Sequence, residues 1–264
     1  MLVVCNGAYK SGSSWLFHIV SELGEFRHPE PEFGDRAWRR VPTIAPDRLA
    51  AFRAAGRHRT ADYICKTHFD SPRHRQLLVG TDHVFVLDIQ RDLRDVVVSA
   101  YHYHVGLGRF LGDFERFYWI EGRLVADRVV RYHRRWQGAP DKVLVASYER
   151  LHADFDGEVA RIAAFLGLTP SPERLAQVRE RTSLGQLRQR YGEEAREAQA
   201  RFYRKGEVGD WQNHMTPAVL ADLAAIEERG LPLLARATCV IRTKAHRAVR
   251  AWPRTRLRPL IGRS

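Results

Sequence analysis

The sequence predicts an α/β protein with three α/β/α layers, in which helices cover both faces of a mainly parallel central sheet. Apolar runs of strand length alternate along the chain with amphipathic stretches of helix length, an order typical of parallel strands joined by helices. Several of these runs are almost continuously apolar, as expected of strands buried on both faces. The chain has 264 residues, of which 44% are hydrophobic, so it is long enough to bury a full core.

We expect one domain over residues 1–230 and a basic, partly helical tail over residues 231–264. The formal net charge of +12 lies mostly at the C-terminal end, because from Arg229 onward there are ten Arg or Lys residues and no Asp or Glu. Without these ten, the chain has 33 basic and 31 acidic residues, a net charge of +2. The body is therefore nearly balanced in charge, and we expect no specific nucleic-acid binding.

The stretch Tyr9–Trp15 follows the first expected strand, Leu2–Cys5, and opens an amphipathic helix. Gly12 and the small serines allow backbone N–H groups to close on an oxyanion, while Lys10 and the helix start add positive charge. The stretch is not a Walker A loop, since Ser13 stands where that loop requires lysine. It predicts a phosphate cradle of another kind, with an ordinary glycine-containing turn as the alternative.

Two further expected strands end in residues that carry chemistry. Tyr63–Cys65 precedes Lys66 and His68, and the strongly apolar strand His83–Ile89 precedes Arg91. Ligands of α/β sheets bind at the carboxyl ends of strands, so these side chains are candidates for a site. His68 could take a proton near neutral pH, and Arg91 offers a fork for a phosphate. The alternatives are a surface histidine and an ordinary Arg–Asp ion pair.

The other segments continue the alternation of helix and strand. Ser99 lies on the helix expected after Arg91 and offers a hydroxyl donor. The irregular residues 25–56 either shape a substrate pocket or cover the sheet, and the aromatic residues between Val105 and Trp119 fit an acceptor pocket or plain core. Helices are expected near residues 46–55, 96–101, 123–136, 155–166, from 172 and 217–230, with one more strand over 143–148.

Taken together, these stretches resemble the PAPS-dependent sulfotransferases of the cytosolic type, across most of residues 1–230. Four landmarks of that family occur in order. They are Tyr-Lys-Ser-Gly-Ser-Ser-Trp at residues 9–15 for the 5′-phosphosulfate loop, Lys66-Thr67-His68 for the catalytic segment, Arg91 with Ser99 for the 3′-phosphate site, and Arg204-Lys205-Gly206 with the following Gly-Asp-Trp for the C-terminal loop.

The resemblance implies a sulfotransferase that moves a sulfuryl group from PAPS to a hydroxyl or amine acceptor by in-line transfer, releasing PAP without a metal. It implies that His68 is the base, that Lys10 stabilises the leaving phosphate, and that Lys66 helps to hold the sulfuryl group. The residues implied to bind the nucleotide are Lys10, Ser11, Gly12, Ser13, Ser14, Trp15, Arg91, Ser99, Tyr148, Thr182, Leu184, Arg204, Lys205 and Gly206.

The sequence departs from the family pattern at several positions. Tyr9 replaces the usual proline, Leu184 stands where an aromatic residue is usual, and Phe69-Asp70 follows the histidine in place of Leu-Pro. Because Phe69-Asp70 alters the acceptor side, the sequence does not decide whether the acceptor is a small molecule, a lipid or a carbohydrate. Two other classes also stay open: a P-loop kinase or NTPase, and a non-catalytic polyanion-binding protein on a degenerate sulfotransferase fold.

In the tail, apolar residues from Val240 to Trp252 recur at helical spacing among basic ones. This pattern resembles a basic helix that rests on anionic lipid, but it also fits contact with an acidic protein or a solvated helix. The three scattered cysteines indicate reduced thiols, and an apolar strand that starts at Leu2 leaves no room for a signal peptide. We therefore expect a cytoplasmic protein, with peripheral membrane contact as one option.

Overall fold

The computed structural model describes residues 1–28, 35–38, 41–138, 141–192 and 205–256. Contacts between Cα atoms divide the chain into two compact units. The first unit comprises Met1–Asp92 and Tyr132–Val208, and the second comprises Leu93–Arg131 and Gly209–Ser264. The first contains the sheet, and the described part of the second is helical.

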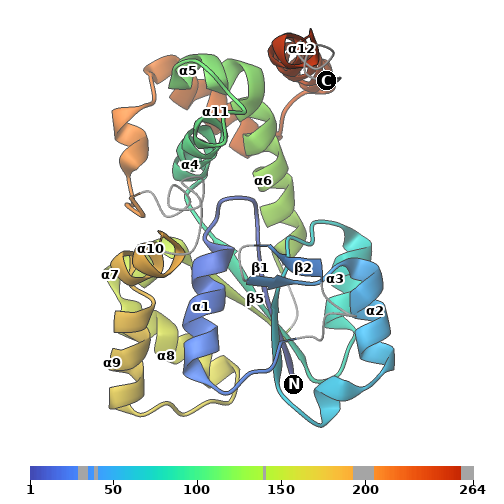
Figure 1. Cartoon of the computed structure of the whole chain (residues 1–264), viewed down its shortest axis with the longest axis vertical. Helices are drawn as coiled ribbons and strands as arrows, with labels where there is room; N and C mark the ends of the chain where they lie inside the picture. The colour runs from blue at the N-terminus through green and yellow to red at the C-terminus, as the bar shows by residue number, and fades with distance from the viewer. Residues whose placement is uncertain (29–34, 39–40, 139–140, 193–204, 257–264) are drawn as a thin grey trace, which may run out of the picture. The chain divides into compact units, whose positions relative to one another are not determined.

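The sheet of the first unit has six strands in the order β2-β3-β4-β1-β5-β6. Figure 1 labels β1, β2 and β5 among them. The strands are β1 (Leu2–Gly7), β2 (Asp35–Trp38), β3 (Val41–Thr43), β4 (Tyr63–Lys66), β5 (Val84–Gln90) and β6 (Val143–Ser147). All neighbouring strands are parallel except the antiparallel pair of β2 and β3. Every residue of β1 is buried because β4 and β5 flank it on either side. The expected mainly parallel sheet is confirmed.

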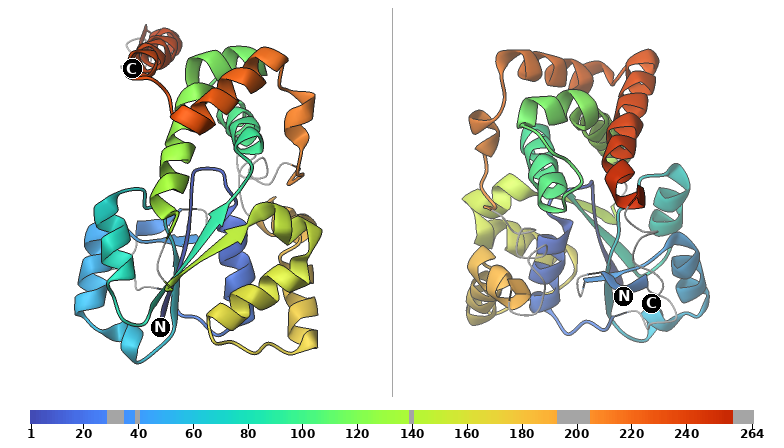
Figure 2. Two further views of the ribbon diagram at one scale, coloured as in Figure 1. Left: turned by 180° about the vertical axis from the view of Figure 1, so that it is seen from behind. Right: turned by 45° about the horizontal axis from the view of Figure 1, so that its top comes forward.

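Helices lie on both sides of this sheet, as Figures 1 and 2 show for α1 and α3. Trp15, Ile19 and Ile162 belong to a buried cluster that also includes sheet residues. The helices of the first unit are α1 (Ser13–Leu23), α2 (Pro46–Ala54), α3 (Pro72–Val79), α7 (Tyr148–Ala153), α8 (Phe155–Phe165), α9 (Pro172–Arg181) and α10 (Leu184–Gly192), with the short η1 (Arg57–Arg59). This arrangement confirms the three-layer prediction.

The sequence did not predict β2 and β3, which lie within the segment expected to be irregular apart from one helix. The two strands have only four and three residues, so they show no clear period of two. β3 also contains Pro42, which cannot donate a ladder hydrogen bond. Short strands of this composition leave little signal in the sequence.

The second unit packs aromatic side chains into a core of its own. Phe110, Phe114, Phe117 and Tyr118 are all buried, which fits the interpretation of this aromatic stretch as core. The helices of this unit are α4 (Leu93–Gly106), α5 (Phe114–Phe117), the π-helix η2 (Tyr118–Gly122), η3 (Asp210–Asn213), α11 (Pro217–Arg229) and α12 (Leu233–Arg256), while α6 (Arg123–Trp136) begins here and ends in the first unit. None of the helices in the described residues is long and apolar enough to cross a bilayer.

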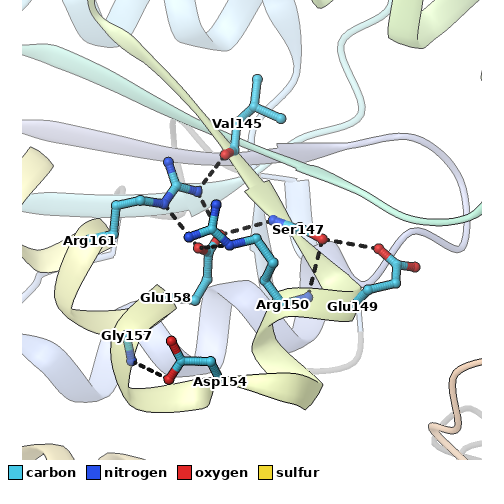
Figure 3. A network of polar contacts seen from close by, with 8 residues as sticks. All are labelled: Val145, Ser147, Glu149, Arg150, Asp154, Gly157, Glu158 and Arg161. Atoms are coloured by element: carbon cyan, nitrogen blue, oxygen red, sulfur yellow. Dashed lines mark hydrogen bonds and ion pairs between the residues drawn. The ribbon is translucent and has the colours of Figure 1, made fainter.

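A buried carboxylate on α8 fixes the end of β6 (Figure 3). Glu158 accepts hydrogen bonds from the Ser147 N–H at 3.0 Å and from Arg161 Nε at 2.9 Å. Arg161 also donates to the Val145 carbonyl at 2.6 Å, and Arg150 Nε lies 3.2 Å from the carboxylate. Burial alone would raise the pKa of Glu158, but the two arginines and the Ser147 N–H outweigh it and hold the pKa below its usual value. The network thus fixes the turn at which α7 begins.

We predict that Glu158→Gln lowers the free energy of unfolding by about 2 kcal/mol at neutral pH, because a buried carboxylate loses charge-assisted hydrogen bonds. Since the folded-state pKa of Glu158 lies below 4.5, this stabilisation is present above the unfolded pKa and is lost as the pH falls through the folded one. Denaturant unfolding at neutral pH and at a series of lower pH values measures both effects. The same exchange at Glu228, in an exposed pair with Arg229, should cost less than about 0.5 kcal/mol. Equal losses at the two sites would contradict the prediction.

Candidate functional site

The loop that follows β1 contains two residues in the left-handed backbone region. Lys10 has φ 67° and Gly12 has φ 100°, and α1 begins directly afterwards at Ser13 without a side-chain cap. A Cβ atom at Gly12 would lie 2.7 Å from Cδ2 of Tyr148, so only glycine fits there. The first N–H groups of a helix have no partner within the helix, and the helix dipole adds to the charge of Lys10. The loop therefore has the form of an anion-binding nest.

Ser11, at the centre of this loop, supplies a buried hydroxyl group. Its N–H donates to the Ala8 carbonyl at 3.2 Å, but its Oγ has no hydrogen-bond partner among the described residues. A buried polar group without a partner costs about 1–3 kcal/mol, which an oxyanion in the loop would remove. Ser13 and Ser14 are also buried, on the first turn of α1. The residues present therefore fit a bound phosphate group.

β4 ends at Lys66 and places His68 beside the end of β1. Lys66 Nζ lies 2.8 Å from His68 Nε2, and His68 Nδ1 lies 2.8 Å from the Gly7 carbonyl oxygen. A protonated lysine can only donate, so Nε2 is the acceptor and Nδ1 donates its proton to Gly7. Burial first, and then the charges of Lys66 and Lys10, lower the pKa of His68 to about 4. At neutral pH this side chain is therefore a neutral imidazole whose basic nitrogen faces Lys66.

A buried polar network, which the sequence did not predict, holds the backbone on both sides of this histidine. Asn6 Oδ1 accepts hydrogen bonds from Thr67 Oγ1 at 2.9 Å and from the Phe69 N–H at 3.0 Å. Asn6 Nδ2 lies 3.3 Å from Asp88 in β5, and the Tyr132 hydroxyl on α6 donates to the same carboxylate. Burial raises the pKa of Asp88 to about 6, although its hydrogen bonds oppose the shift. The network joins the central strands β1 and β5 to Thr67 and Phe69, the residues on either side of His68.

Aromatic rings from α1 and α7 lie next to the loop. The ring centroids of Trp15 and Tyr148 are 5.3 Å apart, and Trp15 Nε1 donates to the Thr182 carbonyl at 2.9 Å. Arg91, at the end of β5, places its guanidinium carbon 4.1 Å from the Tyr148 ring centroid. The ring centroid of His152, a residue not predicted from the sequence, lies 4.9 Å from that of Trp15. Four predicted site residues from distant parts of the sequence are therefore close together.

Comparison with protein families identifies the group to which this arrangement belongs. The family model described as Sulfotransferase domain matches residues 3–233. The chain belongs to this sulfotransferase family. It is 32% identical over 116 residues to cytosolic sulfotransferase 17 of Arabidopsis thaliana, covering 39% of this chain and 34% of that protein. It is 27% identical over 236 residues to human sulfotransferase 2B1, covering 79% of this chain and 60% of that protein.

The fold of this member of the family is also similar to that of a solved structure. The crystal structure of mouse sulfotransferase SULT7A1 complexed with PAP matches with a TM-score of 0.65 at 20% sequence identity. The match covers 89% of this chain and 87% of the mouse chain. At this level of identity the likeness supports the fold alone.

Three more of the predicted nucleotide-binding residues lie in the first unit. Leu184 begins α10 and packs directly against Gly206, where a Cβ atom would overlap the leucine side chain. Lys205 Nζ lies 3.5 Å from the carboxylate of Glu207, whose carbonyl accepts a hydrogen bond from Arg91 at 3.0 Å. The segment after Gly206 is thus joined to the end of β5.

The remaining two predicted residues are placed differently. Ser99 lies on α4 in the second unit, and Arg204 lies outside the described residues. Asp95, one turn before Ser99, accepts hydrogen bonds from the N–H groups of Gly209 at 2.7 Å and Trp211 at 3.0 Å. The Gly-Asp-Trp part of the fourth landmark is therefore fixed to the helix that carries Ser99.

One group of potential metal ligands occurs in the part of the chain that the structure describes. His102, Asp210 and His214 of the second unit bring their ligand atoms within 4.8 Å of one another. His102 Nε2 lies 3.4 Å from His214 Nε2, which lies 3.5 Å from an Asp210 carboxylate oxygen. These side chains contact one another through His214 Nε2, and we assign no metal to the group.

We predict that the pKa of His68 is near 4 and that its neutral form carries the proton on Nδ1. Nitrogen NMR of histidine-labelled protein across the acid to neutral range measures both the pKa and the tautomer. Lys66→Met should raise the pKa of His68, because it removes a neighbouring positive charge while leaving burial in place. A wild-type pKa near the ordinary value of 6.5, or an Nε2–H tautomer, would show that the Lys66 contact is absent in solution.

Proposed function

We propose that this chain transfers a sulfuryl group from PAPS to the hydroxyl or amine group of a small-molecule acceptor and releases PAP. The observation that carries the proposal is a neutral histidine held by Lys66 and the Gly7 carbonyl at the strand end next to a lysine-containing anion loop. Membership of the sulfotransferase family supports it, as does PAP in the mouse structure of similar fold. PAPS, when bound, supplies the sulfuryl group and a phosphate leaving group.

In this proposal the loop after β1 holds the 5′-phosphate. The N–H groups at the start of α1 and the hydroxyl of Ser11 would donate to its oxygens, which satisfies the otherwise partnerless Ser11 Oγ. Lys10 would stabilise the charge that develops on the leaving oxygen. A compact ammonium with three donors suits a single oxygen better than a planar guanidinium does.

The other end of the nucleotide would lie along β5 and α7. The fork of Arg91 suits the 3′-phosphate, and the segment around Lys205 offers further donors, while a role for Ser99 stays a prediction from the sequence. Trp15, Tyr148 and Thr182 would surround the adenine, and Leu184 would add an aliphatic contact. Leu184 packs directly against Gly206, where a Cβ atom would overlap the leucine side chain.

The base in the transfer is His68. As the acceptor oxygen bonds to sulfur, its proton goes to His68 Nε2. The electrons of the breaking S–O bond go to the 5′-phosphate oxygen beside Lys10. Lys66 must leave Nε2 for this step, and its ammonium would then donate to an oxygen of the sulfuryl group. Thr67 and Phe69, held by Asn6, keep the imidazole in place while Lys66 moves.

We predict that wild-type protein binds PAP and that Arg91→Ala weakens binding by about 30-fold or more, because charge-assisted hydrogen bonds to phosphate are lost. Isothermal titration calorimetry measures both affinities. Arg229→Ala, which removes an exposed guanidinium in an exposed ion pair, is the matched control and should bind PAP as wild type does. Absence of PAP binding by the wild type would refute the nucleotide site, and equal affinity in Arg91→Ala would remove Arg91 from it.

We predict that His68→Gln keeps its affinity for PAP but lowers kcat by about 10²- to 10⁴-fold, the usual contribution of a general base. Turnover of labelled PAPS with an acceptor identified by screening measures this. In the wild type, the acid side of the kcat/KM profile should fall near pH 4, because the lowered pKa of His68 keeps it neutral above that pH. His28→Gln, at an exposed histidine, is the control. Full activity in His68→Gln would assign the base elsewhere.

A further inference from the structure

One face of α12 exposes large apolar side chains. Leu233 and Leu234 are 78% and 86% exposed, Ile241 is 67% exposed and Val240 is 37% exposed. These four residues, here named the α12 apolar face, make up half of the eight exposed large hydrophobic side chains in the described residues. The family match ends at residue 233, where the helix begins, so the face lies beyond the matched domain except for Leu233.

The rest of the second unit fixes which side of α12 points outward. Cys239 is fully buried, and the Thr243 hydroxyl donates to the Ile120 carbonyl at 2.9 Å. Arg236 donates to both oxygens of the buried Asp127 carboxylate, at 3.0 and 3.1 Å. At about 100° per residue, Cys239 and Thr243 lie roughly opposite Ile241 on the helix. The α12 apolar face is therefore the side turned away from the body of its unit.

Basic side chains border this face. The helical positions of Arg242 and Arg247 are about 100° and 120° from Ile241, one on each side, and Lys244 lies within the face. Lys244 can extend its aliphatic stem along the apolar residues and keep its ammonium at the edge. The 24 residues of α12 include seven Arg or Lys and no Asp or Glu. The helix therefore combines an exposed apolar stripe with the positive charges of Arg242 and Lys244, while Arg247 on the other border is paired with Glu121.

We propose that the α12 apolar face rests on an anionic lipid surface. Leucine and isoleucine side chains would enter the boundary between headgroups and acyl chains, while Arg242 and Lys244 would pair with lipid phosphates. Arg247 is already paired with the buried carboxylate of Glu121 at 3.4 Å. The alternative of a second copy of this chain is disfavoured, because two such faces would bring like charges together. The proposal does not depend on the transfer reaction proposed above.

The test is co-sedimentation of the full chain with two kinds of vesicle. One is phosphatidylcholine alone, and the other is an equimolar mixture of phosphatidylcholine and phosphatidylglycerol. We expect binding to the anionic vesicles that weakens as salt is added. The triple variant Leu233→Gln, Leu234→Gln, Ile241→Gln should partition about 30-fold or more weakly, because the apolar contribution is lost. Arg242→Gln with Lys244→Gln should weaken binding to anionic vesicles by about tenfold and leave binding to pure phosphatidylcholine unchanged.

The control is Leu111→Gln, the same exchange at a leucine that is 63% exposed outside α12, and it should bind vesicles as wild type does. PAP affinity should be the same in the triple variant and the wild type, so failure here leaves the nucleotide proposal standing. Wild-type protein that stays in the supernatant with anionic vesicles would overturn the proposal. So would a self-associated wild type that the triple variant converts to monomer, or retention on polyglutamate beads without vesicle binding.

Discussion

The carboxyl end of β1 is the constraint on which the candidate site depends. Asn6 and Gly7 are the last two residues of this central strand, and each fixes part of the segment after β4. The Asn6 side chain holds the Thr67 hydroxyl, and the Gly7 carbonyl accepts a hydrogen bond from His68. A Cβ atom at Gly7 would lie 2.8 Å from Ile89 Cγ2, so glycine also allows β1 to approach β5. One strand end thus sets the positions of its neighbours on both sides.

Two buried carboxylates in the first unit show how their partners decide their charge. Asp88 is bonded by the neutral groups of Asn6, Gln90 and Tyr132, and burial raises its pKa. The burial of Glu158 also favours the uncharged acid, but two arginines keep its pKa low. The first network is a positioning device without a full countercharge, and the second is an ion-pair cluster at the edge of the sheet.

The part of the site that the sequence predicted consists of polar residues at the ends of expected strands. Lys66, His68 and Arg91 each follow an apolar run, and parallel strands bring such ends to one edge of a sheet. Asn6 and Asp88 were not predicted, because each is a single polar residue at a strand position and its partners are far away in the sequence. The three-layer fold with a mainly parallel sheet was predicted, but α3, α10 and the strands β2 and β3 were not, and the two strands are too short to show a period.

The contact between Lys66 and His68 also bears on what happens before an acceptor arrives. The lone pair of Nε2 is occupied by the ammonium, so a water molecule near the site finds no free base to take its proton. An acceptor has to be positioned well enough to replace this hydrogen bond before it is activated. In the reaction proposed for this chain, such a resting pair would limit wasteful hydrolysis of the activated sulfate donor.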